Sequence, residues 1–169
     1  MVRAGSKARA SNIVKPKYIK KASSESLTSN TTLQNDDDFV ISLEADKVYH
    51  VALHAMVTGP AAGDIKFEWA VTGGVAALTN RHVEGPATTT ADVADTNVRS
   101  SGAHALTTSV PYGVDGSSGS RIVEDFLVET TTAGTAGTLT LKWAQNTSNA
   151  SATAMNVNSF LIVTEVEAV

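Results

Sequence analysis

The chain has 169 residues and a mass of 17.6 kDa, which suits one domain and is short for two. It contains no cysteine, and this excludes disulfide scaffolds, thiolate metal sites and cysteine nucleophiles. With 21 Thr, 16 Ser, 24 Ala and 12 Gly against nine aromatic residues, the composition favours many short strands over long helices.

Charge is distributed unevenly along the chain. The formal net charge is −4, but residues 1–21 carry seven basic side chains and no acidic one. The other 148 residues carry six basic and 17 acidic side chains, a net charge of −11. A basic segment therefore precedes an acidic body. Because residues 1–12 have no apolar periodicity, we expect the segment to be disordered or extended unless a partner orders it.

The basic segment does not have the pattern of a secretory signal, which needs an apolar region of about 7–15 residues after its positive start. A transit peptide is the weaker alternative for such a segment. No run of about 18 apolar residues is present, so we expect no membrane span. The sequence predicts a protein that is made and kept in a cytoplasm.

The first predicted elements are short. Pro16 opposes a helix, and Tyr18 and Ile19 after it predict a short strand. The polar residues 35–38 predict a turn. Apolar and polar residues then alternate over 39–44, which predicts a half-buried strand.

Two longer apolar segments follow. Over 47–58, a period of two places Tyr49, Val51 and Leu53 on one face. A helix is the alternative there, but the β-branched residues and the Gly-Pro pair at 59–60 favour a long strand. Residues 65–71 form the clearest amphipathic strand. Because a short Gly- and Pro-containing loop joins the two segments, we predict a hairpin.

The second half of the chain is less regular at first. Residues 72–120 are rich in Gly, Thr, Ser, Ala and Asp, and they predict long loops with two or three short strands. Alternation returns in three later segments, each of which predicts a strand: 121–130, 137–146 and 159–168.

These elements predict an all-β fold, a single jelly-roll-like β-sandwich with an extended basic N-terminal arm. About eight strands are separated by turn signals, and no repeat at solenoid or propeller periods is present. We predict that the arm covers residues 1–22 and the sandwich residues 23–169, with long loops in 72–120.

Metal sites are not predicted. His50 and His54 lie four residues apart, so on a strand they project from one face at a separation of about 13 Å, too far for one ion. A zinc-binding helix motif would need Glu where Val51 stands. The run Asp36–Asp38 could supply oxygen ligands for calcium, but EF-hand spacing is missing, and a solvated turn is the better interpretation.

Catalytic and cofactor sites are not predicted either. Glu124 and Asp125 are adjacent, so on a strand they face opposite ways and cannot act as one acid–base pair. No nucleophile-elbow motif occurs. The glycines of 113–119 lack the Lys and the strand–helix context of a phosphate loop. We therefore expect no enzymatic activity and no cofactor.

The basic arm is the remaining chemical feature. Its cations could neutralise phosphates, or they could bind an acidic protein surface. The charge of −11 on the body opposes binding of nucleic acid to the sandwich, so a tether to a protein assembly is the simpler hypothesis. The candidate binding residues are Arg3, Lys7, Arg9, Lys15, Lys17, Tyr18, Lys20 and Lys21.

Two segments resemble a module of structural proteins from tailed bacteriophages, especially phages of actinobacterial hosts. The first is SSESLTSNTTLQNDDDFVISLEADKVYHVALHAMVTGPAAGDIKFEWAV (23–71), with the run SxxSLTSxTTLQxDDD and the later VTGPAAGDIKF. The second is GTLTLKWAQNTSNASATAMNVNSFLIVTEV (137–166), which is similar to the last two strands of the module. The section between them carries no such resemblance.

The resemblance implies a non-enzymatic virion protein, with a jelly-roll module that is commonly trimeric. The module fills nearly the whole chain behind one short arm. This arrangement favours a capsid decoration (cement) protein that binds the outer face of the major capsid shell through the arm. The alternative is a tail-fibre or receptor-binding protein that contacts the bacterial surface through loops in 72–120, with a host-surface glycan as the candidate partner. Retention on DNA would instead indicate a nucleic-acid-binding accessory protein.

Overall fold

The computed structural model describes residues 14–76, 78–88, 98–116, 119–130 and 134–166, with the backbone alone over 98–101. Within these ranges it contains twelve strands and no helix, so it offers no helix that could cross a membrane. The strands are β1 (Lys17–Lys20), β2 (Glu25–Leu27), β3 (Gln34–Leu43), β4 (Val48–Thr58), β5 (Ile65–Gly73), β6 (Thr79–Pro86), β7 (Val98–Ala105), β8 (Val110–Tyr112), β9 (Ser120–Glu129), β10 (Gly137–Ala144), β11 (Thr153–Met155) and β12 (Phe160–Val166).

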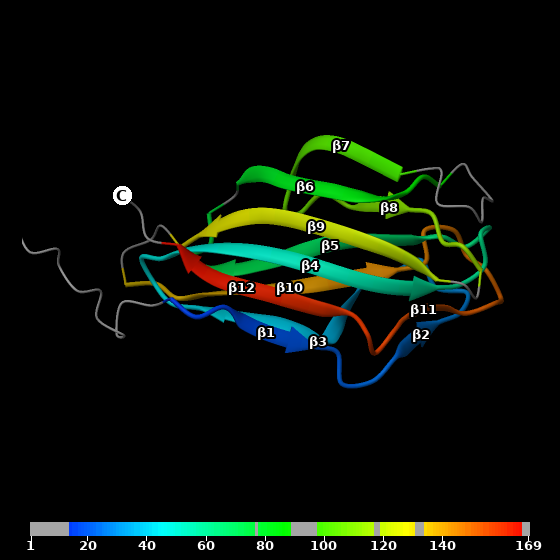
Figure 1. The fold of residues 1–169 in the computed structure, drawn as a ribbon, viewed down its shortest axis with the longest axis horizontal. Helices are drawn as coiled ribbons and strands as arrows, with labels where there is room; N and C mark the ends of the chain where they lie inside the picture. Colours follow the sequence, from blue (N-terminus) through cyan, green and yellow to red (C-terminus); the bar gives the residue numbers. More distant parts are fainter. Residues whose placement is uncertain (1–13, 77, 89–97, 117–118, 131–133, 167–169) are drawn as a thin grey trace, which may run out of the picture.

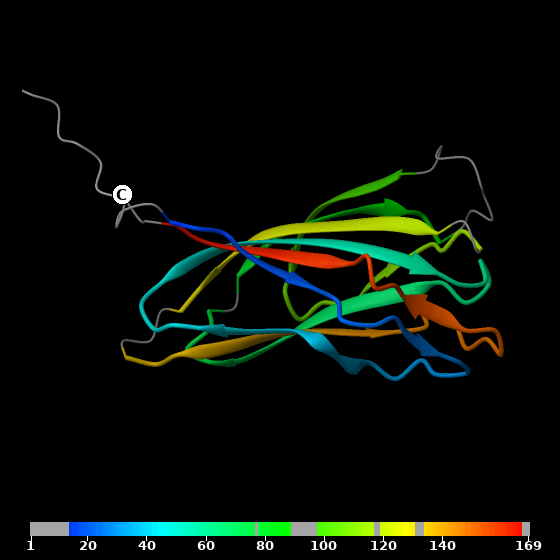
Figure 2. The same ribbon diagram turned by 60° about the horizontal axis from the view of Figure 1, so that its bottom comes forward.

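The strands form two antiparallel sheets that pack face to face (Figures 1 and 2). The larger sheet, sheet A, has the order β1-β12-β4-β9-β6-β7, and β11 and β2 continue it beside the end of β4. The smaller sheet, sheet B, has the order β3-β10-β5-β8. The quartets β1-β12-β4-β9 and β3-β10-β5-β8 have the strand order of a jelly roll, and β6 and β7 extend the first quartet beyond β9. This order confirms the predicted fold class.

Alternation along the strands builds the core between the sheets. In β10, residues 137, 139, 141 and 143 are buried, and the residues between them are partly exposed. Trp69, Trp143 and Phe67 project from sheet B and are fully buried. Phe126 of sheet A contacts Trp69, with ring centroids 5.2 Å apart. The inward-facing apolar residues of both sheets thus form one cluster that holds the layers together.

The predicted hairpin over 47–71 is wrong, although both of its strands are present. β4 pairs with β9, β11 and β12 in sheet A, whereas β5 pairs with β10 and β8 in sheet B. The loop between them crosses from one sheet to the other. Both segments carry an apolar face, and placing those faces in opposite layers buries them against each other.

The predicted turn at 35–38 lies inside β3. Residues 36–39 form a bulge, because Val40 pairs with Thr140 and Asn35 pairs with Lys142, so that only Leu141 lies opposite the four residues. The Asp36 carboxylate accepts the backbone N–H groups of Asp38 and Phe39, both at 3.0 Å. The expected solvated turn is therefore wrong for Asp36, whose side chain is buried within a strand.

The end of the predicted arm belongs to the sandwich. β1 pairs with β12 over residues 17–20, so it forms one edge of sheet A. Ile19 packs against the core from this strand. Further along, β6, β7 and β8 lie in the irregular section 72–120, of which residues 77, 89–97 and 117–118 are outside the described ranges.

Candidate interaction surface

The predicted capsid-binding residues fall into three groups. Arg3, Lys7 and Arg9 lie outside the described residues. The second group is exposed at the edge of sheet A and comprises Lys15, Lys17, Tyr18 and Lys20. Lys21 differs from these, since its side chain is fully buried and contacts carboxylates of its own chain. The structure therefore takes Lys21 out of any binding surface.

Strand β1 presents its exposed residues because side chains alternate across a strand. Tyr18 pairs with Ile162 and Lys20 pairs with Phe160 on the outer face of sheet A, while Ile19 faces the core. Tyr18 is 68% exposed, although it is an aromatic residue. The strand therefore places the cation of Lys20 and the ring of Tyr18 on the outer face of the sheet, while Lys17 is exposed on the same side as Ile19.

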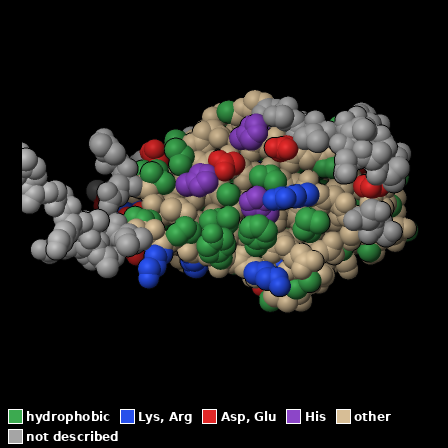
Figure 3. Space-filling view, viewed as in Figure 1, with side chains coloured by type: hydrophobic (Ala, Val, Ile, Leu, Met, Phe, Trp, Pro, Cys, Tyr) green, Lys and Arg blue, Asp and Glu red, His purple; other side chains and the backbone are tan. Residues whose placement is uncertain are grey.

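The outer face of sheet A carries a mixed apolar and histidine surface (Figure 3). Cross-strand register places His54 of β4 between Phe160 of β12 and Val123 of β9. The rings of His54 and Phe160 stack, with centroids 4.6 Å apart. Burial lowers the pKa of His54, and the nearby Arg121 guanidinium lowers it further. This histidine is therefore a neutral, half-buried part of the apolar surface.

The predicted separation of His50 and His54 is consistent with their different partners. His50 Nε2 lies 2.8 Å from Asp125 Oδ2, whereas His54 Nδ1 lies 2.7 Å from Arg121 Nη2. The described residues contain no group of three or more His, Asp or Glu side chains arranged to hold a metal ion. On this face the two histidines serve packing and hydrogen bonding.

A buried ion pair crosses the interior of the sandwich. Glu124 of β9 accepts two hydrogen bonds from Arg81 of β6, from Nε at 2.9 Å and Nη2 at 2.7 Å. Trp69 Nε1 donates to the same carboxylate at 2.7 Å, and the Tyr112 hydroxyl donates to it as well. Both charged side chains have no exposed surface. The remaining Arg81 N–H groups donate to backbone carbonyls of residues 67, 106 and 108.

This ion pair ties sheet A to sheet B, because Trp69 and Tyr112 belong to β5 and β8. Sequence analysis placed Glu124 and Asp125 on opposite faces, which is correct, but missed that Glu124 faces inward. Alternation with the apolar neighbours Ile122 and Phe126 is the signal that could have placed it in the core. Every donor of the pair is used within the chain, so the geometry supports a structural role.

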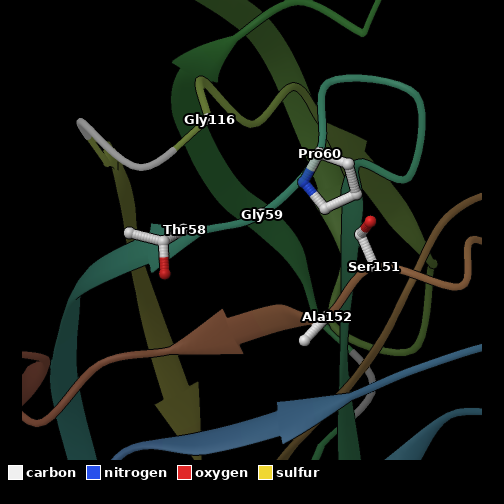
Figure 4. A pocket seen from close by; sticks show the side chains of 6 residues that line it. All are labelled: Thr58, Gly59, Pro60, Gly116, Ser151 and Ala152. Carbon is white, nitrogen blue, oxygen red and sulfur yellow. The ribbon is translucent and has the colours of Figure 1, made fainter.

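A shallow pocket lies where β4 ends (Figure 4). Its volume is about 490 Å³, and its lining residues are Thr58, Gly59, Pro60, Gly116, Ser151 and Ala152. None of these side chains is charged or aromatic. The pocket therefore lacks both the stacking surface and the ionic groups that would fix the orientation of a ligand.

The fold and the surfaces described above define the class of this protein as a jelly-roll β-sandwich. Its described residues offer faces for contact with other molecules. No family model and no curated protein matches the chain. A chain in the structure of infectious bursal disease virus, Gx strain, is similar at 11% identity with a TM-score of 0.24. The similarity covers 91% of this chain and 41% of that one. A TM-score this low supports no inference about function.

Proposed function

We propose that this chain is a non-enzymatic structural protein of a virion: a decoration protein on the outer face of the major capsid shell of a tailed bacteriophage. The observation that carries the proposal is the charge pattern. Seven cations precede a body with a net charge of −11, and the described residues Lys15, Lys17 and Lys20 are exposed at one edge of sheet A. The protein is made in the host cytoplasm and ends in the virion.

Attachment uses several weak contacts together. Acidic groups of the shell pair with the basic side chains of Arg3, Lys7, Arg9, Lys15, Lys17 and Lys20. Tyr18 packs beside these pairs. Each exposed ion pair contributes about 0–1 kcal/mol. No single contact therefore fixes the protein to the shell, and the sum of the contacts decides occupancy.

Association of three copies strengthens this attachment. The outer face of sheet A supplies apolar surface for such an interface, since Leu127 is 40% and Val166 39% exposed close to the histidine pair. A homotrimer holds three basic segments above one shell, and the second and third segments then bind at a raised effective concentration.

The test uses purified undecorated capsids and a triple variant, Lys15→Glu, Lys17→Glu and Lys20→Glu. Co-sedimentation should show an affinity at least about tenfold lower than that of the wild type. The matched control is Lys66→Glu, a single charge reversal on the outer face of sheet B, which should bind like the wild type. Unchanged binding of the triple variant would refute the tether.

Location in the virion separates the proposal from its alternative. Antibody labelling of intact particles should mark the head. Label confined to the tail tip would favour the receptor-binding alternative through residues 72–120.

A further inference from the structure

A lysine and three carboxylates meet where the edge of sheet A crosses β3 of sheet B. Lys21 follows β1 directly, and its side chain has no exposed surface. Its Nζ lies 2.7 Å from Asp36 Oδ2, 2.6 Å from Glu25 Oε2 and 3.4 Å from Asp38 Oδ2. The ring of Phe39 lies 5.6 Å from Nζ and covers the amine on one side. Nζ is therefore held against a buried carboxyl group without free access for water.

The two oxygens of Asp36 have different surroundings. Oδ2 faces the amine, whereas Oδ1 accepts the backbone N–H groups of Asp38 and Phe39, each at 3.0 Å. Two N–H donors fixed on one oxygen polarise the carboxyl carbon and stabilise negative charge that develops on that oxygen during attack. The bulge in β3 supplies these donors, so the local backbone activates the Asp36 carboxyl group.

Glu25 is placed to carry a proton. Its Oε2 contacts the same Nζ, and 20% of its side chain is exposed. Burial raises the pKa of Glu25 above its ordinary value, and the neighbouring Asp36 carboxylate also raises it, against the hydrogen bond from Lys21. A carboxyl group with a raised pKa can both accept a proton and return it.

We propose that Lys21 and Asp36 form an intramolecular isopeptide bond between Nζ and Cγ, with Glu25 as the proton carrier. The ammonium group of Lys21 first gives one proton to Glu25. The neutral Nζ attacks Cγ of Asp36, and an electron pair moves onto Oδ1. A second proton from Nζ and the proton held by Glu25 reach Oδ2, the bond between Cγ and Oδ2 breaks, and one water leaves. The amide keeps the third proton of Nζ, and Glu25 is regenerated.

Proton loss from the amine is the difficult step. Burial alone would lower the pKa of Lys21, but the hydrogen bonds to Asp36 and Glu25 outweigh this and hold the pKa above its ordinary value. The reaction occurs once in each chain, however, and the fold keeps the reacting groups together throughout. Fixed proximity replaces a bimolecular encounter and is worth many orders of magnitude in rate, so a small fraction of neutral amine is sufficient.

The bond would link the strand that carries the exposed cations to the opposite sheet. β1 is an edge strand of four residues, and β3 is an edge strand of sheet B. A covalent link between residues 21 and 36 joins these edges and closes one side of the sandwich. This inference does not depend on the proposed attachment to capsids.

Mass spectrometry of the purified full-length chain tests the inference. The wild-type protein should be lighter than its sequence predicts by the mass of one water. After proteolysis, a branched peptide should join the segments that contain Lys21 and Asp36. A wild-type chain of full mass, or a water loss that maps elsewhere, would overturn the proposal and leave a buried ion pair.

Variants test the roles of the carboxylates. Glu25→Gln keeps the shape of the side chain and should slow bond formation by about 100-fold or more, because general acid–base catalysis contributes at least that much. Asp36→Ala should abolish the branched peptide. The matched control is Asp37→Asn, which alters the exposed carboxylate next to Asp36 and should leave the bond intact. Formation of the bond at the wild-type rate in Glu25→Gln would refute the assigned role of Glu25.

Discussion

Removal of one partner from a buried ion pair costs more stability than removal of an exposed charge. Glu124 is fully buried, and its carboxylate is fully hydrogen-bonded by Arg81, Trp69 and Tyr112. The pair is stable only as a unit, because either charge alone would be buried without compensation. The pair joins β6 and β9 of sheet A to β5 and β8 of sheet B.

The first prediction concerns this pair. Glu124→Gln should lower the free energy of unfolding by about 3–5 kcal/mol, because the Arg81 charge stays buried without a counter-charge. Urea denaturation followed by fluorescence of the buried Trp69 and Trp143 measures the change. Glu84→Gln, an exposed position on β6, should stay within about 0.5 kcal/mol of the wild type. A similar small loss for Glu124→Gln would contradict the structural role.

A second prediction concerns pH and Asp64, which is 7% exposed in the loop between β4 and β5. Burial raises the pKa of Asp64 from 3.8 to about 6, although a hydrogen bond from the backbone of Val114 acts in the opposite direction. Between about pH 4 and pH 6 the folded state therefore binds more protons than the unfolded state, and this group removes about 3 kcal/mol of stability as the pH rises. Above that window the loss is complete.

Asp64→Asn should remove this pH dependence and make the protein more stable than the wild type at neutral pH. Asn also suits the backbone, since residue 64 has a φ of +50°. Urea denaturation of both proteins at about pH 4.5 and pH 7.5 gives the difference between their free energies of unfolding at each pH. The control is Asp37→Asn, a substitution at an exposed position. An equal gain at both pH values would mean that ionisation of Asp64 is not the cause.

At the scale of elements, β1 makes the end of the basic segment part of sheet A. Its pairing with β12 and the burial of Lys21 behind it make residues 17–21 part of the sandwich. The described cations of this segment therefore divide between the exposed Lys15, Lys17 and Lys20 and the buried Lys21.

Two truncations test this division. A chain that begins at Val14 should unfold at the same urea concentration as the full chain, because residues 1–13 carry no apolar pattern to bury. A chain that begins at Ser23 should be less stable by about 3–5 kcal/mol, since Asp36 then stays buried as a charged group without Lys21 and β12 becomes a bare edge. Equal stability of the two truncated chains would place the boundary at residue 22, as the charge pattern alone suggests.

At the scale of the whole molecule, the basic segment attracts an acidic partner, whereas the acidic body repels it. If attachment rests on exposed charges, the occupancy of capsids should fall steeply as ionic strength rises from about 0.1 to 1 M, because the screening length shrinks from about 10 to 3 Å. Co-sedimentation at increasing salt measures this occupancy, with circular dichroism as the check on the fold. Binding that is insensitive to salt would point to the apolar face of sheet A as the main contact.

The sequence alone was sufficient for the fold class and for most of the longer strands, whereas it did not predict the short strands β2 and β11. A period of two is a local property of the chain, so the alternation over 47–58 and 65–71 predicted β4 and β5 closely. It also placed His50 and His54 on one face and separated Glu124 from Asp125, because side chains on a strand alternate between its two faces.

Only the tertiary structure decided which sheet each strand joins and which charges are buried. The contact of Lys21 with Asp36 spans 15 residues and that of Arg81 with Glu124 spans 43. Local alternation can place a residue such as Glu124 on the inward face, but it does not reveal the partner that compensates its charge, because that partner comes from a distant strand. Local alternation therefore determined the elements, while the packing of two sheets determined the chemistry between them.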